Sequence, residues 1–125
     1  MKQFDIFIKN RPGELARVAE TLAMNGINIV AIVSERTRKP IIKIVTNDEQ
    51  STRSALSNGK FKFEEYELLV LELSDRPGEL VKIARKLANR GLNVESIHIL
   101  GKRDENTRIG LVIDNIEKAK EVLRL

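Results

Sequence analysis

The chain contains one segment twice. The six residues Asn10–Leu15 (Asn-Arg-Pro-Gly-Glu-Leu) return as Asp75–Leu80, with a change only at the first position. A shift of 65 residues aligns the two copies without a gap over residues 11–32, and half of these positions are identical. Such a repeat must be recognised before any other fold prediction, and it predicts two similar units, residues 1–65 and 66–125. A domain of about 60 residues buries only about 60% of its unfolded surface, so we expect the two units to pack together.

The apolar residues of the first unit predict a strand, a helix, two strands, a second helix and a last strand. Apolar residues alternate over residues 2–8, which is the period of a half-buried strand. Pro12 fits a first helical turn and Gly26 fits a helix end. Between them lies one apolar stripe at helical spacing, formed by Leu15, Val18, Ala19, Leu22 and Ala23. The other expected elements are strands over 27–34 and 40–46, a basic hairpin tip at 36–39, and a helix from Asn47 or Asp48 to about Ser57.

The second unit repeats this pattern. One long strand over residues 61–73, straight or bent, is expected to serve both units, and its apolar second part suggests burial on both faces. After Pro77 the helical stripe returns as Leu80, Ile83, Ala84, Leu87 and Ala88, and Gly91 ends the helix. Strands over 92–100 and 107–113 follow. Asp114 is then expected to cap a last helix, whose inward residues are Ile116, Ala119, Val122 and Leu123.

Both units therefore read as α+β, with the ferredoxin-like order βαββαβ. The second unit departs from this order, because the sequence stops at Leu125 and leaves no segment for its last strand. The edge of residues 67–73 would then lie open, and a long apolar edge invites association. We expect either another chain or the strand over residues 61–65 to cover that edge.

The amino-acid composition excludes several classes of function. The chain is 42% hydrophobic and 32% charged, which is typical of a soluble globular protein. It has no cysteine and one histidine, so disulfides, thiol catalysis and the usual zinc ligand sets are excluded, and we expect no cofactor or metal. No apolar run approaches the roughly 20 residues that span a bilayer, and the N-terminus lacks the apolar block of a signal peptide. We therefore expect a cytoplasmic protein without a membrane partner.

The two copies of the turn stand between a strand and a helix, and each unit starts its second strand with Gly-Ile/Leu-Asn-Ile/Val, at Gly26–Ile29 and Gly91–Val94. Recurring at matching places in a βαββαβ pattern, these motifs resemble ACT domains over nearly the whole chain. The arrangement is most similar to stand-alone tandem ACT proteins, which carry no catalytic domain. The resemblance implies a non-enzymatic, regulatory protein that forms a homo-oligomer, expected to be a dimer. It also implies that a small ligand, usually an amino acid, binds at the interface between paired units.

The resemblance assigns ligand contacts to the turn and to the start of the second strand. In the first unit these are Asn10, Pro12, Gly13, Glu14, Leu15 and Asn28; in the second they are Asp75, Pro77, Gly78, Glu79, Leu80 and Asn93. Elementary chemistry agrees with this assignment. A helix N-terminus offers unpaired N–H groups to the carboxylate of a zwitterion. The two glycines allow close approach to the backbone, and an asparagine side chain can both donate and accept.

Other interpretations of the same residues stay open. Asn10 and Asp75 could only cap their helices, Asn28 and Asn93 could only satisfy local backbone groups, and Gly13 and Gly78 could be required by the turn alone. The alternative for the whole chain is an oligomerisation module without a ligand.

Two further functions are more remote. In an acylphosphatase-like enzyme Arg11 would act with Asn28, or Arg76 with Asn93. However, Pro12 and Pro77 each remove an N–H donor that a phosphate-binding turn needs. An RNA-binding domain of this topology stacks bases on strand aromatics. Aromatic residues are only 4% of the chain, and the net charge of +4 is spread among 18 acidic residues, so no nucleic-acid partner is expected.

Overall fold

A computed structural model describes residues 1–36 and 39–125, and the chain divides into two compact units, Met1–Tyr66 and Glu67–Leu125. The expected hairpin tip at 36–39 therefore lies partly outside the described residues. The elements follow in the order β1 (Lys2–Phe7), α1 (Glu14–Met24), β2 (Ile29–Arg36), β3 (Pro40–Thr46), α2 (Glu49–Asn58), β4 (Lys62–Glu67), β5 (Leu69–Ser74), α3 (Glu79–Asn89), β6 (Val94–Arg103), β7 (Asn106–Ile113) and α4 (Ile116–Leu123).

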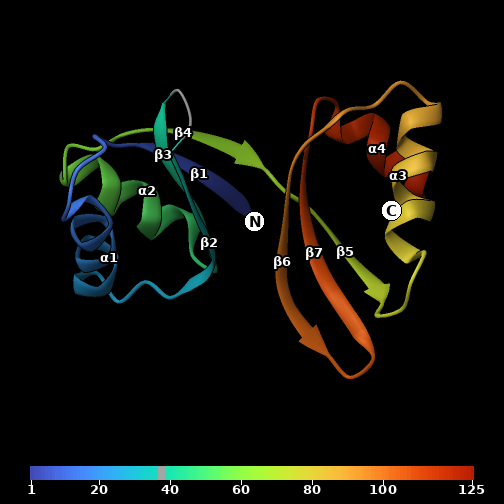
Figure 1. Cartoon of the computed structure of the whole chain (residues 1–125), viewed down its shortest axis with the longest axis horizontal. Helices are drawn as coiled ribbons and strands as arrows, with labels where there is room; N and C mark the ends of the chain where they lie inside the picture. Colours follow the sequence, from blue (N-terminus) through green and yellow to red (C-terminus); the bar gives the residue numbers. More distant parts are fainter. Residues whose placement is uncertain (37–38) are drawn as a thin grey trace. The chain divides into compact units, whose positions relative to one another are not determined.

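The first unit has the expected ferredoxin-like fold. Its sheet has the strand order β2-β3-β1-β4, and β3 pairs antiparallel with both β1 and β2. Helices α1 and α2 lie together on one side of this sheet (Figure 1). The helices and strands share one apolar core, made of Phe4, Ile6, Val18, Leu22, Ile27, Ile42, Ile44, Ala55, Leu56 and Phe61. Of the predicted helical stripe Val18 and Leu22 are buried and Ala19 is partly buried, whereas Leu15 and Ala23, at its two ends, are exposed.

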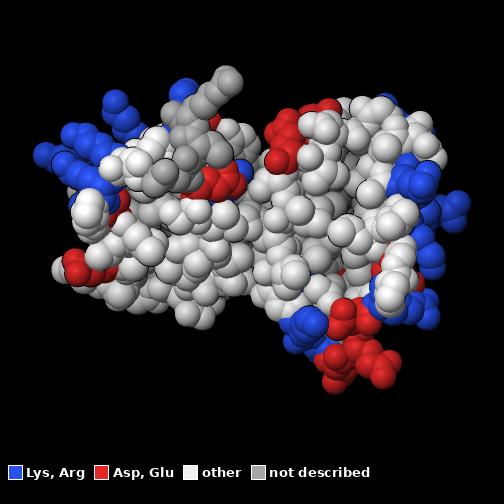
Figure 2. Space-filling model, in the orientation of Figure 1, with Lys and Arg blue, Asp and Glu red and all other residues white. Residues whose placement is uncertain are grey.

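The second unit repeats the fold without its last strand, as predicted. Among the described residues its sheet has three strands, in the order β5-β7-β6. Helices α3 and α4 pack on one face, and all four predicted inward residues of α4 belong to the core. Lys and Arg side chains stand on the side of α3 away from the sheet (Figure 2).

The long segment predicted over 61–73 serves both units, as expected, but it is interrupted at one residue. The chain forms two strands, β4 and β5, separated at Leu68, and β4 belongs to the first sheet, where it lies beside β1. Residues 61–65 therefore do not cover the edge of the second sheet; whether another chain does stays a prediction. The expected burial of β5 on both faces is wrong, because Leu69 and Leu71 are buried while the alternate Glu72 is exposed.

The turn before each first helix differs from the prediction. Neither proline lies in the helix: α1 starts at Glu14 and α3 at Glu79, each directly after a glycine with positive φ, 92° at Gly13 and 90° at Gly78. L-residues rarely adopt this conformation, so the turn itself requires glycine. Because the capping position is glycine, the alternative that Asn10 and Asp75 cap these helices is wrong.

Of the predicted caps, one is confirmed and one is displaced. The Asp48 side chain accepts a hydrogen bond from the Ser51 amide at 3.0 Å and caps α2, as expected. The cap of α4 is Asn115, which accepts from the Lys118 amide at 3.1 Å, and not Asp114. Asp114 instead accepts a hydrogen bond from the backbone of Asn93 at 3.1 Å, which ties α4 to the start of β6.

The hairpin of the second unit is longer than that of the first. Ile32 pairs with Ile44, and Ile97, its repeat equivalent, pairs with Leu111, which lies 67 residues after Ile44 and not 65. The β6–β7 hairpin thus has two more residues than the β2–β3 hairpin. The first strand of the second unit, β5, is also longer at its end. It continues to Ser74, two residues beyond the repeat equivalent of Phe7, where β1 ends.

Candidate functional site

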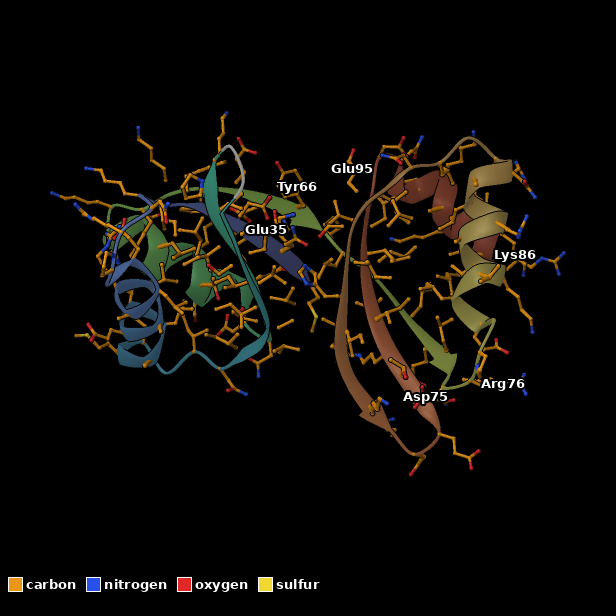
Figure 3. All side chains as sticks on the ribbon, in the orientation of Figure 1. Glu35, Tyr66, Asp75, Arg76, Lys86 and Glu95 are labelled. Carbon is orange, nitrogen blue, oxygen red and sulfur yellow. The ribbon has the colours of Figure 1, made fainter. Side chains whose placement is uncertain are left out.

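The second bend, residues 74–79, opens into a pocket of about 430 Å³. The lining residues all come from the second unit and are Leu73, Ser74, Asp75, Arg76, Glu79, Leu80, Ile97, Ile99, Thr107 and Ile109. Figure 3 shows Asp75 and Arg76 at the junction of β5 and α3. The size and the mixture of apolar and charged lining residues are those of a small-molecule site.

The floor of this pocket is aliphatic. Ile99 pairs with Ile109 across the β6–β7 ladder, so their side chains share the face of the sheet on which α3 and α4 pack. Strand β6 is an outer strand, and Ile99 remains 65% exposed. Leu80, on the first turn of α3, faces the same pocket and is 49% exposed. Aliphatic surface is therefore available to a ligand beside the bend.

The rim of the pocket carries charges of both signs. Lys102 Nζ lies 2.9 Å from Asp75 Oδ2, and this hydrogen bond, followed by the charge of Lys102, holds the pKa of Asp75 below its usual value. Arg76 Nε lies 2.7 Å from Glu79 Oε1, and hydrogen bonds from Arg76 and then Lys82 lower the pKa of Glu79. Exposed pairs of this kind contribute little to stability. A zwitterion can therefore exchange with them at small cost.

The first bend, residues 9–14, is closed. Glu14 is only 4% exposed, and its Oε1 accepts a hydrogen bond from the backbone amide of Lys9 at 2.9 Å. Its Oε2 accepts from Arg17 Nε at 3.2 Å, and the Arg17 guanidinium stands 4.2 Å from the centre of the Phe61 ring. We call this bend closed, because its glutamate is buried and paired with a backbone amide of the same bend.

The difference in strand length explains why two identical glutamates behave differently. In the second unit β5 reaches Ser74, and the next amide, that of Asp75, donates to the Glu105 carbonyl of the hairpin tip at 2.7 Å. In the first unit β1 ends at Phe7, so the Lys9 amide lies beyond the strand and Glu14 accepts from it. Ser74, the repeat equivalent of Lys9, lies inside β5, and Glu79 pairs with Arg76 and Lys82 at the rim.

The closed bend predicts a pH dependence of stability. The hydrogen bond from the Lys9 amide, with further help from Arg17, lowers the pKa of Glu14. A depressed folded-state pKa stabilises the fold above the unfolded-state pKa of about 4.3, and this contribution is lost as the pH falls through the folded-state pKa. Glu14→Gln should therefore lower the free energy of unfolding at neutral pH and have a smaller effect in acid, as measured by urea denaturation.

The matched change for this experiment is Glu79→Gln, because the Glu79 carboxylate pairs with the exposed side chains of Arg76 and Lys82. At neutral pH, Glu79→Gln should lower the free energy of unfolding by less than Glu14→Gln does. Equal costs for the two changes, or a cost of Glu14→Gln that does not diminish in acid, would contradict the structural role given to Glu14.

The structure separates the predicted site residues into two groups. The turn residues of each unit lie together at its bend, and of those in the second unit Asp75, Glu79 and Leu80 line the pocket. Asn93 precedes β6, whose first residue pairs with Ile113 at the opposite end of the sheet. In Figure 3 the nearby Glu95 accordingly lies far from Asp75. Asn28 has the corresponding place in the first unit. A bend and an asparagine could share one site only if the asparagine came from a different unit. That the two kinds of residue share a site stays a prediction.

Sequence reasoning missed six lining residues of the pocket: Leu73, Ser74, Arg76, Ile97, Ile99 and Thr107, together with the core residue Ile109. Alternation of apolar residues in β6 is visible in the sequence and could have placed Ile97 and Ile99 on one face. Their proximity to the bend depends on the register with β7, which no local pattern specifies.

The described part of the chain contains neither a metal-binding cluster of side chains nor a membrane-spanning helix. Residues 1–36 and 39–125 hold no group of three or more His, Cys, Asp or Glu side chains placed to bind a metal ion. Within the same ranges no helix is long and apolar enough to cross a membrane.

In a comparison with known protein families, both units match the same family profile. The profile described as the ACT domain matches residues 3–57 and again residues 66–124. No curated protein sequence matches the chain. A protein of Bacteroides thetaiotaomicron with a solved structure is similar over 98% of this chain and 85% of its own, with 25% identity and a TM-score of 0.88.

Two regulatory subunits of aspartate kinase share the fold. The ligand-free subunit of Thermus thermophilus is 22% identical, with a TM-score of 0.69, and the match covers 98% of this chain and 88% of that one. The subunit of Thermus flavus is 23% identical over the same shares, with a TM-score of 0.65.

Proposed function

Because the chain belongs to the ACT domain family, we propose that it is a non-catalytic regulatory protein whose effector is an amino acid. ACT domains are regulatory modules that bind small ligands. The observation that carries the proposal is the pocket at the second bend, of about 430 Å³, with an aliphatic floor and a rim of both charges. The proposed effector binds there and changes the state of a partner protein.

The rim suits the two charged groups of an α-amino acid. Arg76 offers a planar guanidinium, which recognises a carboxylate through paired hydrogen bonds. Asp75 and Glu79 offer carboxylates for the ammonium group, and both are held in the charged form by their neighbours. The ligand ammonium would replace Lys102 as the partner of Asp75, or Arg76 as the partner of Glu79, so each rim carboxylate keeps a cationic partner.

The proposal keeps the contacts that the family resemblance implies. Pro77 and Gly78 shape the backbone of the second bend, and Asn93 of another unit would complete the site. We further propose a cytoplasmic homodimer, because β5 and β6 are the outer strands of the second sheet in the described structure. Outer strands offer unpaired backbone groups to a second chain.

A thermal-shift screen of the twenty amino acids tests this function. A ligand that binds only the folded state and is present at about 100 times its Kd adds roughly 2.7 kcal/mol of stability. For domains of this size that is a rise in Tm on the order of ten degrees. We expect such a rise with at least one amino acid, and Asp75→Ala should reduce it. A flat response to all twenty would remove the proposed function.

A flat response would favour the second candidate, an oligomerisation module without a ligand. The observation in its favour is the exposure of Ile97, Ile99 and Leu80 on one side of the second unit, 44%, 65% and 49% respectively. Exposed aliphatic patches mark either ligand sites or protein interfaces. Sedimentation that gives the same dimer with and without amino acids, together with a flat screen, would select this candidate.

A further inference from the structure

We propose that the chain has one effector site, at the second bend, and that this site selects an α-amino acid with an aliphatic side chain. The inference rests on the proposed function and specifies its ligand class and its stoichiometry. It is carried by the difference between the two bends, which begin from nearly identical residues.

The aliphatic floor sets the ligand class. Leu73, Ile97, Ile99, Leu80 and Ile109 surround the space below the rim, and the charged groups all lie at the bend. A charged side chain placed on this floor would lose water without gaining a partner, which is costly. An aliphatic side chain would cover apolar surface of Ile99 and Leu80 that is exposed in the free protein.

The ionic groups of the rim lie on one side of that floor. Asp75, Arg76 and Glu79 fall within five consecutive residues at the end of β5 and the start of α3. The carboxylate and ammonium of an α-amino acid are separated by a single carbon, so one short segment can bind both. The side chain then points away from the bend, toward Ile97 and Ile99 on β6.

The first bend differs from the second in both parts of this site. Glu14, the equivalent of Glu79, is 4% exposed and accepts from the Lys9 amide at 2.9 Å, so this acceptor is not available to a ligand ammonium group. At the position of Ile99 the first unit has Ser34, which pairs with Ile42 where Ile99 pairs with Ile109. The floor is thus shorter, and the uncharged Asn10 replaces Asp75. A ligand would gain little from this bend.

Isothermal titration of the full chain with L-leucine, L-isoleucine, L-valine, L-alanine, L-lysine and L-aspartate tests the inference. We expect one molecule bound per chain and an affinity for the best aliphatic amino acid about tenfold or more above that for alanine. Lysine and aspartate should bind more weakly than alanine or not at all. Two molecules per chain, or tightest binding of lysine or aspartate, would overturn the inference and leave the proposed function standing.

A matched pair of variants locates the site. Ile97→Ser should weaken binding of the best aliphatic ligand about tenfold, whereas Ile32→Ser, the same change at the repeat-equivalent position, should leave it unchanged. Both side chains are partly exposed, at 44% and 42%, so both variants are expected to fold, and their melting without ligand checks this. Equal weakening by both changes would overturn the placement in the second unit. Absence of heat with every amino acid would remove the proposed function and this inference together.

Discussion

Truncation of Leu87 to alanine is expected to destabilise the second unit by about 2–5 kcal/mol, the range for a leucine removed from a packed core. Leu87 is 1% exposed and belongs to the cluster formed by Leu71, Leu111 and Ala119 between the sheet and its two helices. A unit of this size has a small core, so the loss of one central side chain is a large part of its stability.

The repeat provides an internal comparison for this change. Leu22, at the equivalent position of α1, is also 1% exposed, and Leu22→Ala should have a similar cost in the first unit. Lys86→Ala, an exposed change on the same helix as Leu87, should alter the free energy of unfolding by no more than about 0.5 kcal/mol.

Hydrogen exchange can assign each loss to its unit. Faster exchange in Leu87→Ala should concentrate in α3 and in strands β5, β6 and β7, and in Leu22→Ala it should concentrate in α1 and β1. If Leu87→Ala melted like the unmodified chain, or lost protection mainly in α1, Leu87 would not be the core residue that its burial indicates.

The parts of the fold that could be predicted from the sequence are those with a local cause. The apolar stripes of α1 and α3 predicted both helices, and the glycines after them marked their ends: Gly26 and Gly91 both have positive φ. The second sheet has three strands in the described part of the chain, in agreement with the prediction for the second repeat. The family profile and the ferredoxin-like fold agree with these predictions.

The difference between the bends could not be predicted, because its cause is not local. Glu14 and Glu79 stand in the same motif, yet one accepts from a backbone amide and the other pairs with Arg76 and Lys82. The feature that differs between the units is the length of the hairpin. The β6–β7 hairpin is two residues longer than the β2–β3 hairpin, and β5, which pairs with β7, ends two residues later in the repeat than β1. Register depends on distant residues and on turn geometry.

The positions of the two asparagines depend on the topology of each unit. The family resemblance assigns Asn28 and Asn93 to the same kind of site as the bends. The topology alone opposes this within one unit, because a helix that follows a strand returns the chain to the end at which that strand began. Asn93 therefore precedes β6 at the end of the sheet opposite the second bend.

Removal of the Arg76 guanidinium should weaken binding of the amino acid effector about ten- to hundredfold, the range for a lost hydrogen bond between charged groups. Arg76 is the rim residue that can bind a carboxylate in two places, and its side chain is 67% exposed, so Arg76→Ala should still fold. Arg76→Lys should restore part of the affinity at most, because an ammonium cannot form the planar pair of hydrogen bonds.

Arg11→Ala is the matched control, because Arg11 holds the same place in the first bend, where its Nε lies 3.9 Å from Glu14 Oε2. A closed bend that binds no effector predicts that this change leaves the titration unaltered. If Arg11→Ala weakened binding as much as Arg76→Ala, both bends would contribute to recognition, and the second bend could not be the separate site that its open pocket indicates. If neither change mattered, the ligand carboxylate would have to bind elsewhere, and the role of the rim would be wrong even though an amino acid binds.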